Sequence, residues 1–195
     1  MQDNDELIRK IFEESARVKE KFFSKKNLPL VNAASEMIAA AFKAGGKLMV
    51  AGNGGSAGDA QHIAGEFVNR FEIERPPLPA MALSTDSSVI TSIGNDYSFD
   101  LIFSKQVMAL GKKGDVLLAI STSGGSRNVI KAVEAAKNIG VKTIALTGKG
   151  GGELGGKADL LLNVDADSTP RIQEVHITVC HVICALVDAA LFQRV

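Results

Sequence analysis

The sequence has no excess of charge of either sign, because 22 lysine and arginine residues balance 22 aspartate and glutamate residues. Phosphate backbones and anionic lipid surfaces are bound through a cationic field, so this balance argues against nucleic acid or a membrane as a partner. A long apolar run is also missing, since no segment approaches the roughly 18 consecutive apolar residues of a membrane-spanning helix. The first residues, MQDNDELIRK, are acidic and polar, unlike a signal or transit peptide. We therefore expect a cytoplasmic protein.

Cysteine and histidine are scarce, because the chain has two cysteines and three histidines. Cys180 and Cys184 lie one helical turn apart in an apolar segment, which favours two buried thiols over a disulfide and suits a reducing cytoplasm.

The 195 residues suit a single domain, residues 1–195, with an N-terminal helical pair (1–45) ahead of an α/β core (46–195). Apolar residues at helical spacing predict the first two helices, 5–25 and Val31–Lys43. Such an amphipathic pair outside a core commonly packs on another subunit, so we expect an oligomer.

From residue 47 the pattern alternates between strand-like and helical segments. The predicted strands are Lys47–Ala51, Ala80–Leu83, Val116–Ser121, Val141–Thr147 and Leu160–Val164. The predicted helices are Ala57–Asn69, Ser87–Ile93, Phe99–Leu110, Arg127–Ile139 and Ile172–Phe192, and Lys149–Gly156 is expected to be a loop. Strands that are apolar throughout predict a doubly wound, five-stranded parallel sheet flanked by helices.

Two strand-to-helix connections carry unusual residues, and ligands of such sheets bind outside the carboxyl ends of the strands. GNGGSAGD (52–59) can turn backbone N–H groups toward a ligand, although it matches neither the dinucleotide fingerprint nor the P-loop. STSGGS (121–126) offers four hydroxyls that suit a phosphate held by neutral donors. The alternatives are a plain tight turn for the first segment and a simple helix N-cap for Ser126 in the second.

Polar side chains on two helices are candidates for chemistry. His62 and Glu66, four residues apart, project from one helix face, where they suit a metal, a shared proton or a plain surface hydrogen bond. The last helix carries Gln173, Glu174, His176 and His181, although a histidine in its apolar stretch is often a core residue.

Five segments in order closely resemble one family: GNGGSAGDAQHIAGEF, TSIGNDYSFDLIFS, GDVLLAISTSGGSRNV, ALTGKGGG and RIQEVHITVCHVI. They are similar to the sedoheptulose 7-phosphate isomerases (phosphoheptose isomerases) of the sugar-isomerase (SIS) domain class. The resemblance covers essentially the whole chain.

The resemblance implies a cytoplasmic homotetramer with one Zn²⁺ per subunit that acts on a phosphorylated heptose. The reaction converts sedoheptulose 7-phosphate to D-glycero-D-manno-heptose 7-phosphate, the first step toward the activated heptose of lipopolysaccharide. The implied zinc ligands are His62, Glu66, Gln173 and His181, of which Glu66 and His181 match the base and the acid. The implied substrate contacts are Asn53, Gly54, Gly55, Ser56, Glu66, Asn95, Asp96, Ser121, Thr122, Ser123, Ser126 and Gln173.

This chemistry moves a proton beside a carbonyl through an enediol, which calls for a carboxylate base and an electrophile at the developing oxyanion. A group bound tightly to zinc carries protons poorly, so Glu66 and His181 cannot hold both roles at once without ligand exchange. Gln173 and His181 also lie eight residues apart, about 12 Å along a helix. The spacing predicts that one of them reaches a site shared with another subunit, or that the helix brings the ion between them.

One position departs from the family, because some relatives carry an acidic residue where this chain has Pro170. The main rival interpretation is a SIS protein that binds the bacterial replication initiator without catalysis, since NRFEIERPPLPAMAL resembles that relative too. The presence of Glu66 and His181 favours the enzyme. A different phosphosugar enzyme, such as an aminosugar phosphate isomerase or a lactyl-ether lyase, is the second rival.

Overall fold

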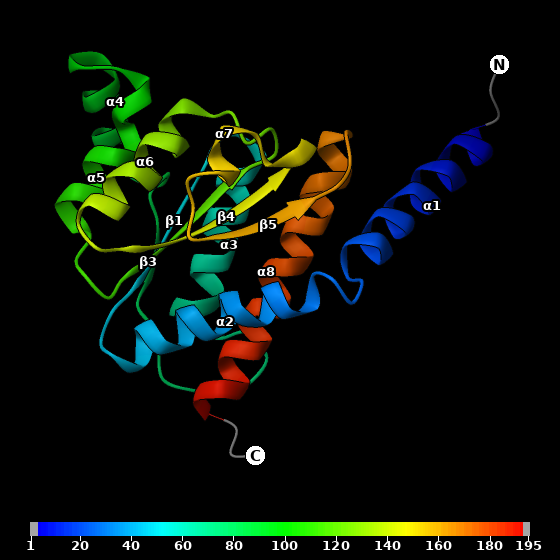
Figure 1. The fold of residues 1–195 in the computed structure, drawn as a ribbon, viewed down its shortest axis with the longest axis horizontal. Coiled ribbons are helices and arrows are strands. Elements are labelled where there is room, and N and C mark those ends of the chain that lie inside the picture. The colour runs from blue at the N-terminus through cyan, green and yellow to red at the C-terminus, as the bar shows by residue number, and fades with distance from the viewer. Residues whose placement is uncertain (1–3, 193–195) are drawn as a thin grey trace.

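A computed structural model describes residues 4–192 and has a five-stranded parallel sheet at its centre (Figure 1). The strands are β1 (Leu48–Gly52), β2 (Ala80–Ala82), β3 (Val116–Ser121), β4 (Lys142–Gly148) and β5 (Leu160–Val164). Their order across the sheet is β2-β1-β3-β4-β5, and every neighbouring pair is parallel. The strand order reverses between β1 and β3, and the crevice at such a reversal is where open parallel sheets bind ligands.

Helices cover both faces of the sheet. They are α1 (Asn4–Phe22), α2 (Leu28–Lys43), α3 (Gly55–Val68), α4 (Ser87–Asp96), α5 (Ile102–Leu110), α6 (Arg127–Asn138), α7 (Gly152–Gly155) and α8 (Thr169–Phe192), with short 3-10 turns η1 (Phe99–Leu101) and η2 (Lys149–Gly151). One hydrophobic layer joins α2, α3 and α8 to the sheet, and a second joins α5 and α6 to its other face. Strands buried on both sides explain the apolar runs of the sequence.

The first helix extends away from the sheet (Figure 1). Only Val18 and Phe22 of α1 are buried. Its apolar side chains Ile8 and Phe12 are 63% and 73% exposed in the single chain. The helix therefore has an amphipathic face that this chain alone does not cover.

The predicted elements agree with the structure to within a few residues, apart from the loop at 149–156. That segment forms η2 and the single turn α7. Left-handed φ angles at Lys149 and at the three glycines after it fold the chain back, and Leu154 is fully buried there. Packing of one leucine thus ordered a segment that its glycine content had marked as a loop.

The last helix is longer than predicted, because it begins at Thr169. Pro170 lies in its first turn, where the missing N–H of proline costs no hydrogen bond. By length and composition α8 is long and apolar enough to cross a membrane, although the sequence predicted no such helix. Nine of its residues are buried, among them Val179 and Ile183 in the hydrophobic layer shared with α2 and α3, which is the setting of a core helix.

Candidate active site

The glycine turn after β1 and the serine loop after β3 (Ser121–Ser126) meet at the strand-order reversal. β1 and β3 are hydrogen-bonded neighbours, with Gly52 opposite Ile120. Asn53 and Asn128 exchange two amide hydrogen bonds of 2.8 and 2.9 Å, which join the two connections. Asn128 was not predicted. An asparagine in the first turn of an otherwise apolar, buried helix face was the available signal.

Hydrogen bonds within the serine loop leave the start of α6 open to a ligand. Ser126 occupies the N-cap position, but its hydroxyl is 2.9 Å from that of Ser121 and makes no capping hydrogen bond. Ser123 Oγ accepts from the amide of Gly125, and the carbonyl of Thr122 accepts from the amide of Gly148. Hydroxyls and helix-terminal amides arranged in this way suit an anion.

The position of Gly124 fixes the serine loop against the next connection. Its φ is +65°, and an added Cβ would lie 2.0 Å from the carbonyl oxygen of Gly151. The carbonyl of Gly124 accepts from the amide of Leu154. Only glycine allows this approach, so the loop is held by both conformation and packing.

Gln173 lies over the N-terminus of α3. A Cβ added to Gly55 would be 1.9 Å from Nε2 of Gln173, so the glutamine side chain fills the space that Gly55 leaves. The side chain of Gln173 therefore borders the glycine turn. Ser56, in the same first turn of α3, is buried.

His62, Glu66 and His181 form a cluster further along α3. The Nε2 atoms of His62 and His181 are 2.8 Å apart, and Glu66 Oε1 is 3.5 Å from Nε2 of His62. The ring of Phe71 stacks on that of His181 at a centroid separation of 5.5 Å. The side chains of His62 and Glu66 are 45% and 24% exposed, so the cluster is open to solvent.

One chain does not bring Gln173 to this cluster. Gly55 meets Gln173 and His62 meets His181, so α3 and α8 run side by side in the same direction. The two meeting points are seven residues apart on α3 and eight on α8, which is about 10–12 Å along either helix. The four predicted zinc ligands thus divide into three that cluster and one that lies at the glycine turn.

Two imidazole nitrogens and a carboxylate are donors that catalytic zinc takes. Within residues 4–192, however, no three His, Cys, Asp or Glu side chains are arranged to hold a metal ion by themselves. The donor chemistry therefore fits zinc, and the single chain supplies an incomplete set.

The third histidine, His176, has a different surrounding. It is fully buried, and its Nε2 donates to the carbonyl of Thr147 at 3.0 Å. Burial lowers its pKa to about 4, in spite of the opposing effect of this hydrogen bond. A neutral histidine at this position belongs to the core. Cys180 and Cys184 are free and buried as predicted, and burial raises the pKa of Cys184 to about 12.

Asn95 and Asp96 lie at the exposed end of α4, where Asn95 Nδ2 donates to Asp96 Oδ1 at 2.9 Å. A hydrogen bond just beyond α4 connects this segment to the serine loop. Asp100 accepts from Nε of Arg127 at 3.1 Å, and Arg127 directly follows Ser126.

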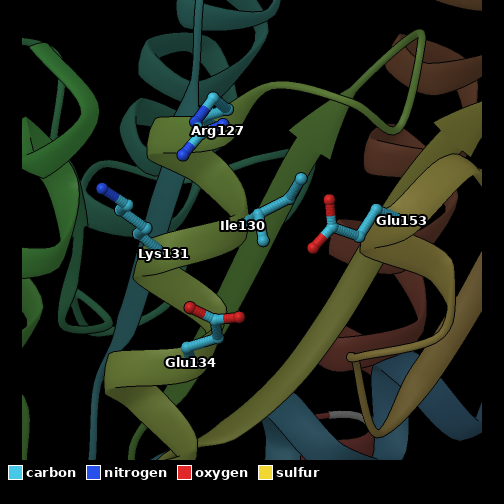
Figure 2. Close-up of a pocket in the computed structure, with 5 residues that line it drawn as sticks. All are labelled: Arg127, Ile130, Lys131, Glu134 and Glu153. Atoms are coloured by element: carbon cyan, nitrogen blue, oxygen red, sulfur yellow. The ribbon is translucent and has the colours of Figure 1, made fainter.

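Arg127 also borders a separate pocket of about 170 Å³ between α6 and α7 (Figure 2). Its other lining residues are Ile130, Lys131, Glu134 and Glu153. Lys157 pairs with both glutamates, at 2.6 and 3.5 Å. Because its acidic groups are already paired, we assign the chemistry to the glycine turn, the serine loop and the histidine cluster instead.

Residues 11–148 match the SIS domain family. Phosphoheptose isomerase of Thermodesulfovibrio yellowstonii is 55% identical over 97% of this chain and 94% of its own length. The corresponding protein of Nitratidesulfovibrio vulgaris is also 55% identical, over 93% of this chain and 87% of its own length.

Solved structures agree with these sequences. Phosphoheptose isomerase GmhA from Neisseria gonorrhoeae superposes with a TM-score of 0.90 at 45% identity, covering 96% of this chain and all of that chain. A phosphoheptose isomerase from Francisella tularensis gives a TM-score of 0.92 at 41% identity, covering 96% and 99% of the two chains. The chain belongs to the phosphoheptose isomerase family of SIS-domain proteins, and it is an enzyme.

Proposed function

We propose that this enzyme interconverts sedoheptulose 7-phosphate and D-glycero-D-manno-heptose 7-phosphate by proton transfer through an enediol. The proposal rests on one juxtaposition. The same α3 begins at the glycine turn beside the serine loop and carries His62 and Glu66 to His181. A phosphate end and a reacting end of one substrate can therefore lie along a single helix.

The hydroxyls and amides of the serine loop would hold the phosphate, whose binding energy would orient the sugar. Glu66, a partly exposed carboxylate, would move the proton between C1 and C2. His181 would exchange a proton with the carbonyl oxygen, and its contact with Phe71 would fix the plane of its ring.

We further propose that His62, Glu66 and His181 would hold a zinc ion together with a ligand from outside the single-chain cluster, and that Glu66 and His181 would carry protons only when exchanged off the ion. When bound, zinc would supply Lewis acidity toward the substrate oxygens. Gln173 is the candidate for the missing ligand, contributed by a neighbouring subunit, because within its own chain it lies at the glycine turn.

A neighbouring subunit is consistent with the uncovered apolar face of α1, and we propose a homotetramer in which α1 packs on another copy. Changing Phe12 to Glu is expected to lower the molar mass in solution, measured by light scattering. A change of Glu13 to Lys on the same helix alters an exposed charge and keeps the apolar side chains, so it is the control. An unchanged mass for Phe12→Glu would remove α1 from the interface.

The function is tested by isomerase turnover with sedoheptulose 7-phosphate, beside fructose 6-phosphate and glucosamine 6-phosphate. We expect turnover of the heptose phosphate alone, abolished by Glu66→Gln and reduced by a chelator. Turnover of an aminosugar phosphate instead would show that the proposed substrate is wrong. Absence of any turnover, together with capture of the replication initiator, would support the rival interpretation of an initiator-binding protein.

A further inference from the structure

Arg75 is a buried arginine outside the five segments that carry the resemblance to phosphoheptose isomerases. Its side chain is 1% exposed, and that of its partner Asp188 is 5% exposed. Nε of Arg75 donates to Oδ1 of Asp188 at 2.9 Å. No hydrogen bond or ion pair joins either side chain to the side chains of His62, Glu66 or His181, so neither has a direct part in the chemistry described above.

The other nitrogens of Arg75 bind the end of α3. Nη2 donates to the carbonyl of Glu66 at 2.9 Å, and Nη1 donates to that of Phe67 at 2.7 Å. A helix leaves its last four carbonyls without partners inside the helix. The guanidinium satisfies two of them and places positive charge at the negative end of the helix. Glu66 therefore lies in a turn whose backbone is held by Arg75.

Asp188 gives this arrangement a second anchor. It lies on α8, seven residues after His181, which is two turns further along the same face of the helix. The ring of Phe192, in the last turn of α8, lies 6.0 Å from the guanidinium carbon. Arg75 thus links the turn of α3 that carries Glu66 to the part of α8 just beyond His181.

We propose that Arg75 and Asp188 are positioning residues that fix the register of α3 along α8, and so hold His62 and Glu66 against His181. The buried side chains of α3 are mostly apolar, among them Ala60 and Ile63, and apolar packing resists sliding only through shape. A planar guanidinium has five N–H donors, and it donates hydrogen bonds only in fixed directions. A buried ion pair of this kind often adds no stability over apolar residues of similar size, so its directional hydrogen bonds are its distinctive contribution here.

The kinetic part of the test rests on the proposed function, and the spectroscopic part does not. In the double variant Arg75→Met/Asp188→Leu, apolar side chains replace both charges. In Asp188→Glu, the charges stay and the carboxylate is displaced by one methylene. Glu74→Ala, which removes an exposed ion pair with Arg70 in the same segment, is the matched control.

Both variants are expected to stay folded, with kcat lower by about 10- to 100-fold and KM changed by less than about threefold. In metal-free protein, the ¹⁵N shifts of the His62 and His181 imidazoles are expected to move, because their Nε2 atoms separate. Glu74→Ala is expected to match the parent in both measurements.

Unchanged imidazole shifts in either folded variant would overturn the proposal, whatever the kinetics show. Failure of both variants to fold would also overturn it, because the pair would then contribute stability only. If the parent enzyme has no turnover, the proposed function fails, and the imidazole shifts alone decide the question of register.

Discussion

Changing Gly55 to Ala tests the position of Gln173 without touching Gln173 itself. The new Cβ would lie 1.9 Å from Nε2 of Gln173 and 3.0 Å from its Oε1. Both are atoms at the end of a flexible side chain, so the glutamine can swing away while the backbone stays in place. Gly58, one turn further along α3, has no atom within 4 Å of an added Cβ and provides the matched control.

The expected changes in stability are small. Replacing a glycine by alanine within a helix gains about 0.5–1 kcal/mol. At Gly55 this gain is offset by a displaced glutamine rotamer, which costs about 0.5–1.5 kcal/mol. Gly58→Ala should therefore raise the free energy of unfolding slightly, whereas Gly55→Ala should leave it within about 1 kcal/mol of the parent.

The expected change in activity is larger. If the glutamine amide binds substrate or completes a metal site, its displacement should lower kcat/KM by about 10- to 100-fold. The assay is heptose phosphate turnover by Gly55→Ala, Gln173→Ala and the double variant. The effect of Gly55→Ala should disappear in the Gln173→Ala background, because the two changes act through one side chain. Parent activity in Gly55→Ala, or full additivity in the double variant, would refute this reasoning.

Three further predictions concern other buried or paired groups. Burial lowers the pKa of His176 to about 4, below its unfolded value of about 6.5. The contribution of the neutral imidazole to the free energy of unfolding is therefore complete above pH 6.5 and is lost as pH falls toward 4. Urea titrations at several pH values should show that the free energy of unfolding falls by about 3 kcal/mol over that range, and that this fall is absent in His176→Gln. The same pH dependence of the free energy of unfolding in both proteins would contradict this. Cys180 and Cys184 should resist a thiol reagent at pH 8 until the chain is unfolded, since burial raises both pKa values, and rapid modification of the folded protein would show that they are accessible. Asp100→Ala removes the connection to Arg127 and should raise KM about fivefold, equivalent to about 1 kcal/mol, with little loss of stability. Glu74→Ala is its control, and an unchanged KM for Asp100→Ala would mean that this ion pair does not position Asn95 and Asp96.

Local patterns predicted the chemistry that lies within one element. His62 and Glu66 share a helix face because helical periodicity places residues four apart together. The serine loop could be assigned to the ligand edge because it follows a buried strand of a parallel sheet. By contrast, helical periodicity did not distinguish His176 from His181, since both lie in one apolar helix, and only the family resemblance gave a role to His181 alone. Burial assigns the first to the core, and contact with His62 assigns the second to the cluster.

The sequence by itself determined the order of strands and helices, the apolar faces that form the sheet layers, and which residues follow each strand. It did so because periodicity and turn chemistry act over a few neighbouring residues. Tertiary structure alone decided how α3 and α8 align, and with that the contact of His62 with His181, the place of Gln173 at Gly55 and the burial of Arg75 against Asp188. These groups are separated by 113 to 119 residues of chain, and their distances depend on packing between whole helices, which no local pattern encodes.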